Sequence, residues 1–463
     1  MQGGPPNLTN KRVLVVGLGR SGIAAAKLCA ARGAHVTVTD KRDAGAFGGA
    51  LGELPVSVER ELGGHQRATF TRAELIVLSP GVPDIPELAA ARAAGVTVTG
   101  EMELASRFVS STLIAITGTN GKSTTTTLVG DIMRATGRPT FVGGNLGEPL
   151  ADAVGTPAAA AGGVCVVEAS SFQLETVDTF HPTVAVLLNI TADHLDRYAD
   201  MQGYAAAKER IFAAQAAGDY AVVNMDDPLS VAASDGIAGR RVGFSVAGAR
   251  DDGGWVAGDA LAVRLPGGGA GATERYPGNL PALVGRHNQA NALAALLAGR
   301  LAGATAAQAE AGLRAFRALA HRMELVAEAG GVAYYDDSKG TNVGAVVAAL
   351  EGFPRPVVLI AGGRDKGGDY APLAAALGRV GRAAVVIGEA ADKIAATLAG
   401  VVPVVRATTL DDAVAAARSA ARPGDAVVLS PACSSFDMFR DYAHRAEVFR
   451  AAVARVAAQE RAP

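Results

Sequence analysis

Short runs of β-branched residues alternate with Ala- and Leu-rich stretches of helical character along nearly the whole chain. The short runs have the length and composition of buried strands, and the longer stretches have those of covering helices. Alternation of this kind is typical of parallel sheets whose faces are covered by helices. The pattern therefore predicts an α/β protein.

The predicted strands form three successive groups, each interleaved with helices. In the first group, strands are expected at residues 13–16, 35–39, 75–78 and 96–99, with a helix at 23–31. In the second group, strands are expected at residues 113–116, 164–167, 184–188 and 221–224, followed by helices at 288–301 and 306–316. In the third group, strands are expected at residues 323–327, 332–335, 357–360, 384–387 and 427–429. The chain of 463 residues is therefore expected to form three domains, at residues 1–108, 109–318 and 319–463.

The Gly-rich segment at residues 250–278 breaks this alternation and contains the sequence PGGGAGA at residues 266–272. Glycine clusters of this density are typical of turns. The segment therefore predicts a loop or a peripheral hairpin.

The composition of the chain indicates which partners and which cellular location to expect. The formal net charge is -2, so no charge imbalance favours binding to nucleic acid or to an anionic membrane. Apolar stretches are interrupted before reaching the roughly 18 residues that span a bilayer, and the amino terminus lacks the pattern of a signal peptide. Three cysteines lie far apart without metal-type spacing, which fits a reducing compartment. We expect a soluble cytoplasmic protein.

The strongest local motif is TGTNGKS at residues 117–123, between a predicted strand and a predicted helix. Backbone N–H groups of such a loop can surround phosphate oxygens, Lys122 supplies positive charge, and the Ser123 hydroxyl can ligate magnesium. The standard pattern has a glycine where Ile116 stands. The motif predicts a central domain similar to P-loop NTPases.

A second glycine motif, GLGRSG at residues 17–22, also joins a predicted strand to a helix, and Asp40 ends the next strand. These positions match the dinucleotide fingerprint, in which glycines allow a pyrophosphate to approach and the acid contacts a ribose. The same geometry suits NAD or a sugar nucleotide, and a structural glycine turn is the plainer alternative. The motif predicts a Rossmann-like first domain, and the third group of strands predicts another.

Polar clusters follow several later strands. Glu168 ends one strand and His194 follows another, so both could face the bound phosphates and hold magnesium or manganese. In the third group, the polar loops at residues 336–342, 362–367 and 431–437 also follow strands. Their lysines could bind small-molecule carboxylates, although Gly, Asp and Ser are ordinary turn residues as well.

Taken in order, the motifs resemble the Mur ligases of peptidoglycan synthesis over essentially the whole chain. The matching motifs are GTNGKSTTTT, GGNLG, EASSFQLE, NITADHLDRY, YAAAKERIF, GRHNQANALAAL, HRMELV, DDSKGTN, GGRDKG and LSPACSSFDMF. So many motifs in one order make chance implausible. The combination DDSKGTN, GGRDKG and SPACSSFD is most similar to the member that adds D-glutamate. Two departures are Gly340, where alanine is expected, and Lys41, where threonine is common.

The resemblance implies ATP-dependent ligation of D-glutamate to UDP-N-acetylmuramoyl-L-alanine in cytoplasmic peptidoglycan precursor synthesis. The reaction would pass through an acyl-phosphate and a tetrahedral intermediate and release ADP and phosphate. The implied cofactors are ATP and Mg²⁺ at two sites, with Mn²⁺ possible, and Lys208 would be carbamylated. The implied partners are the three substrates, without nucleic acid or membrane, and the implied assembly is a monomer.

The resemblance also implies a role for individual residues. Catalytic residues would be Lys122, His194, Lys208 and Lys339. ATP would contact Gly118, Thr119, Asn120, Gly121, Lys122, Ser123, Thr124, Asn288, Asn291, Arg322 and Asp337. Metal ligands would be Ser123, Glu168, His194 and carbamylated Lys208. The UDP-linked substrate would contact Gly17, Gly19, Ser21, Gly22, Asp40, Arg42, Ser79, Gly81, Asn145 and His194. D-Glutamate would contact Lys339, Thr341, Lys366, Ser434, Ser435 and Phe436.

Two other classes of function stay open at this point. An NAD-dependent oxidoreductase would use residues 17–22 and Asp40, but it leaves the Lys122 loop without a role. A non-catalytic nucleotide-binding regulator would bind ATP without substrate-dependent release of phosphate.

Overall fold

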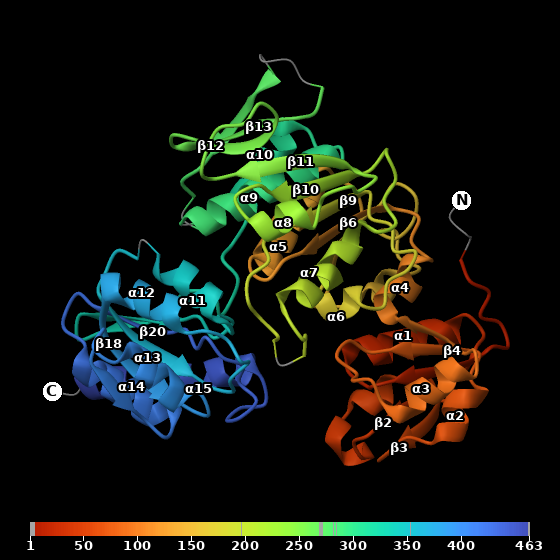
Figure 1. The fold of residues 1–463 in the computed structure, drawn as a ribbon, viewed down its shortest axis with the longest axis horizontal. Coiled ribbons are helices and arrows are strands. Elements are labelled where there is room, and N and C mark those ends of the chain that lie inside the picture. The colour runs from red at the N-terminus through yellow and green to blue at the C-terminus, as the bar shows by residue number, and fades with distance from the viewer. Residues whose placement is uncertain are drawn as a thin grey trace. The chain divides into compact units, whose positions relative to one another are not determined.

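The computed structural model describes residues 5–195, 197–267, 272–280, 282–283, 285–351 and 353–461. The chain forms two compact units, each described here by itself (Figure 1). The first comprises the chain up to Phe316, except for Thr191–Tyr204 and Ala282–His287. Those two segments belong to the second unit, which continues from Arg317. The predicted domain limits after residues 108 and 318 stay predictions.

The first unit begins with a five-stranded parallel sheet in the order β3-β2-β1-β4-β5, the doubly wound arrangement of nucleotide-binding folds. Its strands are β1 (Arg12–Val16), β2 (His35–Asp40), β3 (Glu59–Leu62), β4 (Leu75–Leu78) and β5 (Thr97–Gly100). Its helices are α1 (Arg20–Ala31), α2 (Arg67–Arg72), α3 (Pro86–Ala93) and α4 (Glu101–Ser106). Alternate residues of β1 enter two separate cores, because helices cover both faces. The predicted strands are confirmed, but β3 was missed because its sequence EREL is polar.

The second sheet of this unit has nine strands in the order β14-β13-β12-β11-β10-β9-β6-β8-β7. The parallel strands are β6 (Thr112–Thr117), β7 (Thr140–Gly144), β8 (Val164–Glu168), β9 (Val184–Leu187), β10 (Tyr220–Asn224), β11 (Arg240–Ser245) and β12 (Gly253–Ala257). The longer helices are α5 (Lys122–Ala135), α7 (Met201–Glu209), α9 (Arg286–Leu301) and α10 (Ala306–Ala315). The prediction missed β7 and β11.

The Gly-rich segment extends this sheet at one edge. Strand β13 (Ala260–Arg264) pairs antiparallel with both β12 and β14 (Glu274–Pro277). The predicted hairpin is therefore confirmed in β12 and β13, although it is part of the main sheet. Residues 268–271 of the PGGGAGA sequence lie outside the described residues.

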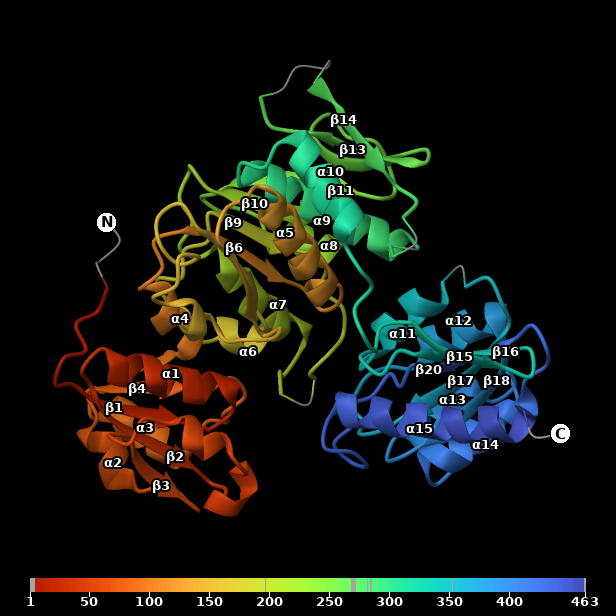
Figure 2. The same ribbon diagram turned by 180° about the vertical axis from the view of Figure 1, so that it is seen from behind.

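The second unit contains a six-stranded sheet in the order β15-β16-β20-β17-β18-β19, parallel except for β15. Its strands are β15 (Glu324–Ala329), β16 (Val332–Asp336), β17 (Val357–Gly362), β18 (Gly381–Ile387), β19 (Val404–Arg406) and β20 (Ala426–Leu429). Helices α14 (Leu410–Ala420) and α15 (Tyr442–Arg461) cover one face (Figure 2). Helices α11 (Val343–Leu350), α12 (Ala371–Val380) and α13 (Ala391–Leu398) cover the other. The short strand β19 was not predicted.

None of the helices in the described part of the chain is both long enough and apolar enough to cross a lipid bilayer.

A buried carboxylate joins the two sheets of the first unit. Glu103 in α4 accepts hydrogen bonds from the backbone N–H groups of Asp178, Thr179 and Phe180, at 2.9–3.1 Å. It also accepts the Thr179 hydroxyl at 2.5 Å and pairs with Arg107 at 2.7 Å. Burial alone would raise the pKa of Glu103, but these donors lower it below the ordinary glutamate value. Glu103 therefore fixes α4 to the loop before β9.

We expect Glu103→Gln to lower the free energy of unfolding by about 1–3 kcal/mol, because the amide cannot replace a charged acceptor of several N–H groups. Urea unfolding followed by circular dichroism measures the change. The matched control is Glu53→Gln. Glu53 is exposed, and it makes only a long ion pair, with 3.9 Å between its carboxylate and Lys27 Nζ. Its effect should stay within about 0.5 kcal/mol. Equal effects of the two variants would contradict the role of Glu103.

The pH dependence gives an independent check on Glu103. Because its folded pKa is lowered, the stabilisation is present above the ordinary glutamate pKa and is lost as pH falls through the folded value. The difference in stability between wild type and Glu103→Gln should therefore shrink as the pH is lowered below about 4.

Candidate active site

The loop at residues 118–121 connects β6 to α5 and requires glycine at two positions. Gly118 and Gly121 have φ angles of +155° and +84°. A Cβ atom at Gly118 would lie 2.9 Å from Leu188 Cβ, and one at Gly121 would lie 2.2 Å from Asn291 Oδ1. The loop thus keeps its backbone close to its neighbours, and α5 begins directly after it at Lys122. An anion there would meet the N-terminal end of a helix.

Asn189, which follows β9, holds this loop. Its backbone carbonyl accepts the N–H of Thr119 at 2.8 Å. Its side chain accepts the N–H of Asn120 at 2.8 Å and donates to the Asn120 carbonyl at 3.1 Å. Asn189 is not among the residues that the sequence predicted for the site. Its place at the end of a buried strand, inside the NITADHLDRY motif, was the available signal.

Lys122 folds back over the loop that it follows. Its ammonium donates to the carbonyls of Gly118 at 2.9 Å and Thr119 at 2.8 Å. The next residue, Ser123, is buried at the start of α5. The positive charge and the hydroxyl that the sequence predicted are thus adjacent to the same turn.

Glu168 and Lys208 converge on the neighbourhood of this loop. Glu168 ends β8 in register with Ile116 of β6, and its Oε1 accepts a hydrogen bond from Asn145 Nδ2 at 2.7 Å. Lys208 in α7 is 1% exposed and donates to the Gly118 carbonyl at 2.9 Å. Two conformationally fixed groups of opposite charge therefore lie beside the predicted phosphate site.

The second oxygen of Glu168 is the observation that tests whether a metal fits. Its Oε2 atom is buried and has no hydrogen-bond partner among the described residues. A carboxylate oxygen in that situation is costly unless a cation or a donor satisfies it. Together with the Ser123 hydroxyl, an oxygen donor of this kind suits Mg²⁺. The residues present therefore fit the implied metal.

The proposed nucleotide residues of the first unit are also linked to the loop. Asn291 in α9 accepts a hydrogen bond from the Thr125 hydroxyl at 3.4 Å, and its amide donates to Asn288 at 3.2 Å. Asn291 is the residue that a side chain at Gly121 would strike. The predicted position of Asn288 and Asn291 near the ATP site is therefore consistent with the fold.

His194 belongs to the second unit, as do Arg322 and Asp337. The His194 backbone has a φ angle of +56°, and its N–H donates to Asp193 Oδ1 at 3.0 Å. Its imidazole Nε2 lies 3.7 Å from Asp193 Oδ2. The prediction that His194 and Glu168 face the same phosphates stays a prediction.

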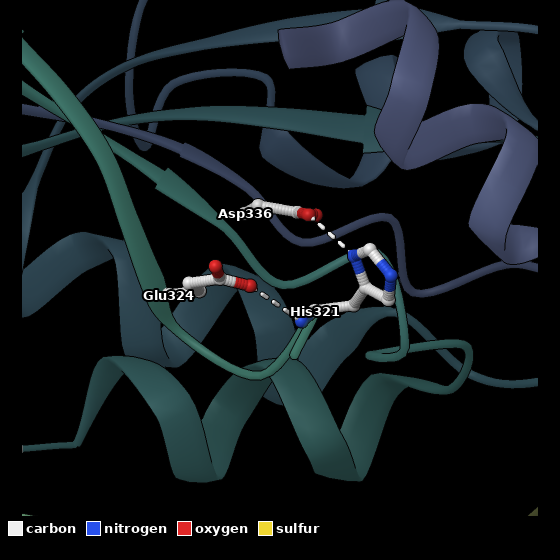
Figure 3. Close-up of side chains that lie close together, drawn as sticks. All are labelled: His321, Glu324 and Asp336. Atoms are coloured by element: carbon white, nitrogen blue, oxygen red, sulfur yellow. Dashed lines mark hydrogen bonds and ion pairs between the residues drawn. The ribbon is translucent and has the colours of Figure 1, made fainter. Parts of the chain in front are cut away.

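Arg322 is flanked by two unusual backbone positions. His321 and Met323 have φ angles of +63° and +47°. Figure 3 shows what fixes the first of them: the His321 N–H donates to Glu324 at 3.0 Å, and its Nδ1 lies 2.8 Å from Asp336 Oδ2. Backbone strain of this kind on both sides of one residue is typical of functional sites.

His321, Glu324 and Asp336 bring their ligand atoms within 4.8 Å of one another, as metal ligands do. The Arg450 guanidinium, however, lies 2.5 Å from Glu324 and 3.4 Å from Asp336. A guanidinium already supplies the positive charge that these carboxylates need. We interpret the cluster as a brace for the His321–Met323 segment rather than a metal site.

Asp337 follows the brace and is buried. Burial raises its pKa to about 7, against the hydrogen bond from the Ser430 hydroxyl and the charge of Arg322, which lower it. Its protonation therefore changes near neutral pH.

The turn at residues 17–22 in the first sheet packs as tightly as the dinucleotide fingerprint requires. A Cβ at Gly22 would lie 1.9 Å from the Gly17 carbonyl, which also accepts the Ser79 hydroxyl at 2.6 Å. Gly19 and Ser21 belong to the same turn, and Gly81 has a φ angle of +82° with open space around it. Gly81 is exposed, and the contact of these residues with the UDP-linked substrate stays a prediction.

Asp40 is engaged within the protein. Its Oδ2 accepts the Leu18 N–H at 2.8 Å, and its Oδ1 accepts the backbone N–H and Nε of Arg42 at 2.9 and 3.0 Å. Burial alone would raise the pKa of Asp40, but these bonds lower it to about 2. Arg42 also stacks over Phe47 at 4.4 Å. Asp40 thus orients Arg42 and the glycine turn, and its contact with a substrate stays a prediction.

The residues predicted to bind the amino acid lie on loops that follow β16, β17 and β20. Lys366 Nζ pairs with Asp193 Oδ1 at 3.0 Å, and Asn342 donates to Asp193 Oδ2 at 3.0 Å. Burial alone would raise the pKa of Asp193, but the charges of Lys366 and His194 lower it below the ordinary aspartate value. A cavity of about 360 Å³ lies beside these groups. Lys366 therefore already has an anionic partner.

The remaining predicted residues of this site surround the same strand ends. Lys339 Nζ lies over the Tyr442 ring at 5.4 Å. The Arg364 N–H donates to the Ser434 carbonyl at 3.0 Å and joins two of the loops. Ser434 and Ser435 are buried, whereas Phe436 is exposed. The fold brings the predicted loops together, and the contacts of Thr341, Ser434, Ser435 and Phe436 with an amino acid stay predictions.

Comparison with protein-family models covers nearly the whole chain. Residues 11–100 match the Mur ligase MurD-like N-terminal domain. Residues 116–299 match the Mur ligase middle domain, and residues 321–433 match the Mur ligase glutamate ligase domain.

Curated relatives match over the full length. A protein of Geobacter metallireducens named UDP-N-acetylmuramoylalanine--D-glutamate ligase is 50% identical over 98% of this chain and 99% of its own. A protein of the same name from Anaeromyxobacter dehalogenans is also 50% identical, over 96% of this chain and 98% of its own.

Solved structures share the fold at low sequence identity. A pseudomurein peptide ligase type C from Methanothermus fervidus has a TM-score of 0.62 at 18% identity, covering 96% of this chain and 100% of its own. UDP-N-acetylmuramate-alanine ligase from Thermotoga maritima has a TM-score of 0.61 at 19% identity, covering 97% and 100%. MurF ligase from Thermotoga maritima, solved with ADP, has a TM-score of 0.58 at 16% identity, covering 97% and 96%. The α/β class with three mostly parallel sheets is confirmed, and the chain belongs to the Mur ligase family.

Proposed function

We propose that this chain ligates D-glutamate to UDP-N-acetylmuramoyl-L-alanine, with the conversion of ATP to ADP and phosphate through an acyl-phosphate. The names of the curated relatives at 50% identity over the full chain support this substrate pair. The reaction serves the synthesis of peptidoglycan precursors. The protein-family matches support the division of labour among three domains, with residues 1–108, 109–318 and 319–463 binding the UDP-linked substrate, ATP and D-glutamate respectively.

The observation that carries the proposal is the charge arrangement around Gly118. The Gly118 carbonyl accepts hydrogen bonds from both Lys122 and Lys208, and the buried Glu168 ends the neighbouring strand with one oxygen that no described residue hydrogen-bonds. Positive charge and an oxygen ligand held rigidly beside a phosphate loop are the requirements of phosphoryl transfer. An NAD-dependent oxidoreductase needs none of these groups.

In the first step, the carboxylate of the muramoyl-alanine substrate attacks the γ-phosphorus of ATP, and ADP leaves. Lys122 and the backbone N–H groups of residues 121–124 stabilise the negative charge that spreads over the γ-phosphoryl oxygens. Magnesium, when bound, supplies further positive charge at that group. Ser123, Glu168, His194 and Lys208 are the residues proposed to hold it at two sites, and Mn²⁺ is an alternative ion.

Lys208 can hold a cation only if its own charge is removed. A carbamate forms when its neutral amine attacks carbon dioxide and loses a proton, which turns a cationic group into an anionic oxygen ligand. The full burial of Lys208 beside the phosphate loop supports this modification, because a buried ammonium is costly there.

In the second step, the amine of D-glutamate attacks the acyl-phosphate carbonyl. The tetrahedral intermediate collapses, the new amide bond remains, and phosphate leaves. The carboxylates of D-glutamate would be held by Lys366, Thr341, Ser434 and Ser435, with Phe436 as a further contact of the amino acid and Lys339 near the reacting groups. Because Lys366 is paired with Asp193, an incoming carboxylate must share that ammonium or replace Asp193.

The other ligand contacts follow the same assignment. The ATP phosphates would lie over Gly121, Lys122, Ser123 and Thr124. Its base and ribose would be held by Asn288, Asn291, Arg322 and Asp337. The uridine diphosphate would lie along Ser21, Asp40, Arg42, Ser79 and Gly81, and the muramoyl-alanine part would contact Asn145 and His194. We further propose a cytoplasmic location, since the three cysteines are free and buried, as in a reducing compartment. The proposal of a monomer rests on the resemblance to the Mur ligases alone.

An amino-acid panel tests the substrate assignment. With ATP and UDP-N-acetylmuramoyl-L-alanine, we expect D-glutamate to give both phosphate release and a product of the added mass. L-Glutamate and diamino acids should give at least 100-fold less product, because the carboxylate-binding groups are fixed on three loops. Preference for another amino acid would overturn the D-glutamate assignment. Nucleotide binding without substrate-dependent phosphate release would indicate a regulator instead.

Replacement of Lys208 tests the carbamate. We expect Lys208→Ala to lower kcat at least 100-fold, because the proposed anionic ligand is lost. Formate or acetate should restore part of the activity by supplying a carboxylate in the vacated space. The control is Lys27→Ala, since Lys27 is exposed, and its activity should not respond to either additive. Full activity of Lys208→Ala without additive would exclude the carbamate.

The phosphate loop is tested by Gly121→Ala. The new Cβ would clash with Asn291 and would place alanine at a φ angle of +84°. We expect kcat/KM for ATP to fall at least 100-fold. Gly137→Ala is a matched control, because Gly137 has a φ angle of +78° but no atom within 4 Å of its Cβ position. Both variants carry about 1–2 kcal/mol of backbone strain, but Gly137→Ala should keep its ATP kinetics within twofold. Similar loss in both variants would contradict a specific role of the loop.

A further inference from the structure

Arg445 in α15 is a fully buried guanidinium, with an exposed fraction of 0%. Its Nη2 donates to the Ser338 carbonyl at 2.8 Å, and its Nη1 donates to the Cys433 carbonyl at 3.3 Å. Its Nε is buried without a hydrogen-bond partner among the described residues. The hydrogen bonds of this charged side chain thus go to backbone carbonyls in two different loops.

Those carbonyls belong to the loops that carry the proposed amino-acid contacts. Ser338 directly precedes Lys339 in the loop after β16, and Cys433 directly precedes Ser434 in the loop after β20. The loop after β17, which carries Lys366, packs against the same group. A Cβ at Gly363 would lie 3.4 Å from Arg445 Nη1. Arg445 therefore lies behind all three loops.

A buried cation is an expensive way to join loops. Burial lowers the pKa of Arg445 to about 10, so the group stays charged at neutral pH. The nearby carboxylates have donors of their own: Asp336 accepts Ser338, Asp337 accepts Ser430, and Asp437 accepts the Glu389 N–H. Apolar side chains of similar volume often replace buried charges without loss of stability. Packing alone therefore does not explain why a charged arginine occupies position 445.

The planar guanidinium suits this position because its fork can reach two carbonyls in separate loops at once. A lysine ammonium would carry the charge on a single atom and would satisfy the two carbonyls less well. The charge also lies behind loops whose proposed ligand is an amino acid with two carboxylates. In a low-dielectric interior, a positive charge acts on such a ligand over several ångströms with little screening.

We propose that Arg445 is a positioning residue of the amino-acid site, which fixes the Ser338 and Cys433 loops and favours the binding of a dicarboxylate through its buried charge. This inference rests on the proposed D-glutamate ligation. Arg445 acts through the loop residues and does not itself touch the amino acid.

Steady-state kinetics of Arg445→Met and Arg445→Lys test the proposal. We expect Arg445→Met to raise the KM for D-glutamate at least tenfold, while the KM for ATP and for the UDP-linked substrate stay within twofold. Arg445→Lys keeps the charge but not the fork, so its KM for D-glutamate should lie between those of wild type and Arg445→Met. Arg455→Met on the same helix is the control, because Arg455 is exposed and pairs with Asp411. Its kinetics should match those of wild type.

The outcomes separate this inference from the proposed function. If wild type forms no product with D-glutamate, the proposed function fails and the inference fails with it. If wild type is active but the KM for D-glutamate is unchanged in Arg445→Met, only the positioning role is overturned. A uniform loss of all kinetic constants together with a lowered Tm would also overturn it, because that is the result of a structural role alone. If Arg445→Met does not fold, the KM of Arg445→Lys for D-glutamate decides, and an unchanged value refutes the proposal.

Discussion

A parallel strand covered by helices on both faces has no space for polar side chains along its length. In this chain, β8, β17 and β20 are buried from end to end. Polar groups that serve chemistry are therefore displaced to the carboxyl ends of the strands, where the backbone turns into a loop. Each sheet follows this constraint, because each proposed binding site begins at the residue where a buried strand stops.

Loops at strand ends must be held in place, since their backbone groups have left the sheet ladder. The protein does this with buried polar side chains that bond to backbone atoms of another loop. Asn189 holds the phosphate loop, Asp40 holds the first glycine turn, and Arg445 holds two loops of the second unit. Each of the three sheets thus has one such side chain. The three differ in chemistry, but each holds its loop in place by bonds within the protein.

The sequence predicted the buried strands well, because runs such as VVLIAG in β17 leave little alternative to a covered strand. It failed for β3, whose sequence EREL is polar and lies at the sheet edge, where one neighbour is enough. The positions of Lys122 and Ser123 at the start of a helix, and of Glu168 at the end of a strand, were predictable from motif and period. The side chains that hold the loops, such as Asn189 and Arg445, were not predictable. An asparagine in a loop or an arginine in an amphipathic helix has the sequence pattern of a surface residue, and only the tertiary contacts show its role. Arg445, in the helix after the SPACSSFD motif, is the plainest example.

Glu168 and Arg445 are two buried groups that are incompletely satisfied, and they have different roles. Glu168 has one hydrogen-bonded oxygen and one buried oxygen without a partner among the described residues, at a place where a cation would restore the balance. The Arg445 Nε also lacks a described partner, but its other nitrogens are committed to carbonyls and its position is behind the loops. Glu168 marks a ligand contact, because it ends the strand paired with β6, which leads into the phosphate loop. Arg445 instead supports the loops, because its guanidinium is fully buried behind them and is bonded to their carbonyls. The phosphate motif of this chain has Ile116 where the standard pattern has its first glycine. Ile116 is a buried strand residue in register with Glu168. At this position, packing in the interior of the sheet therefore determines the residue.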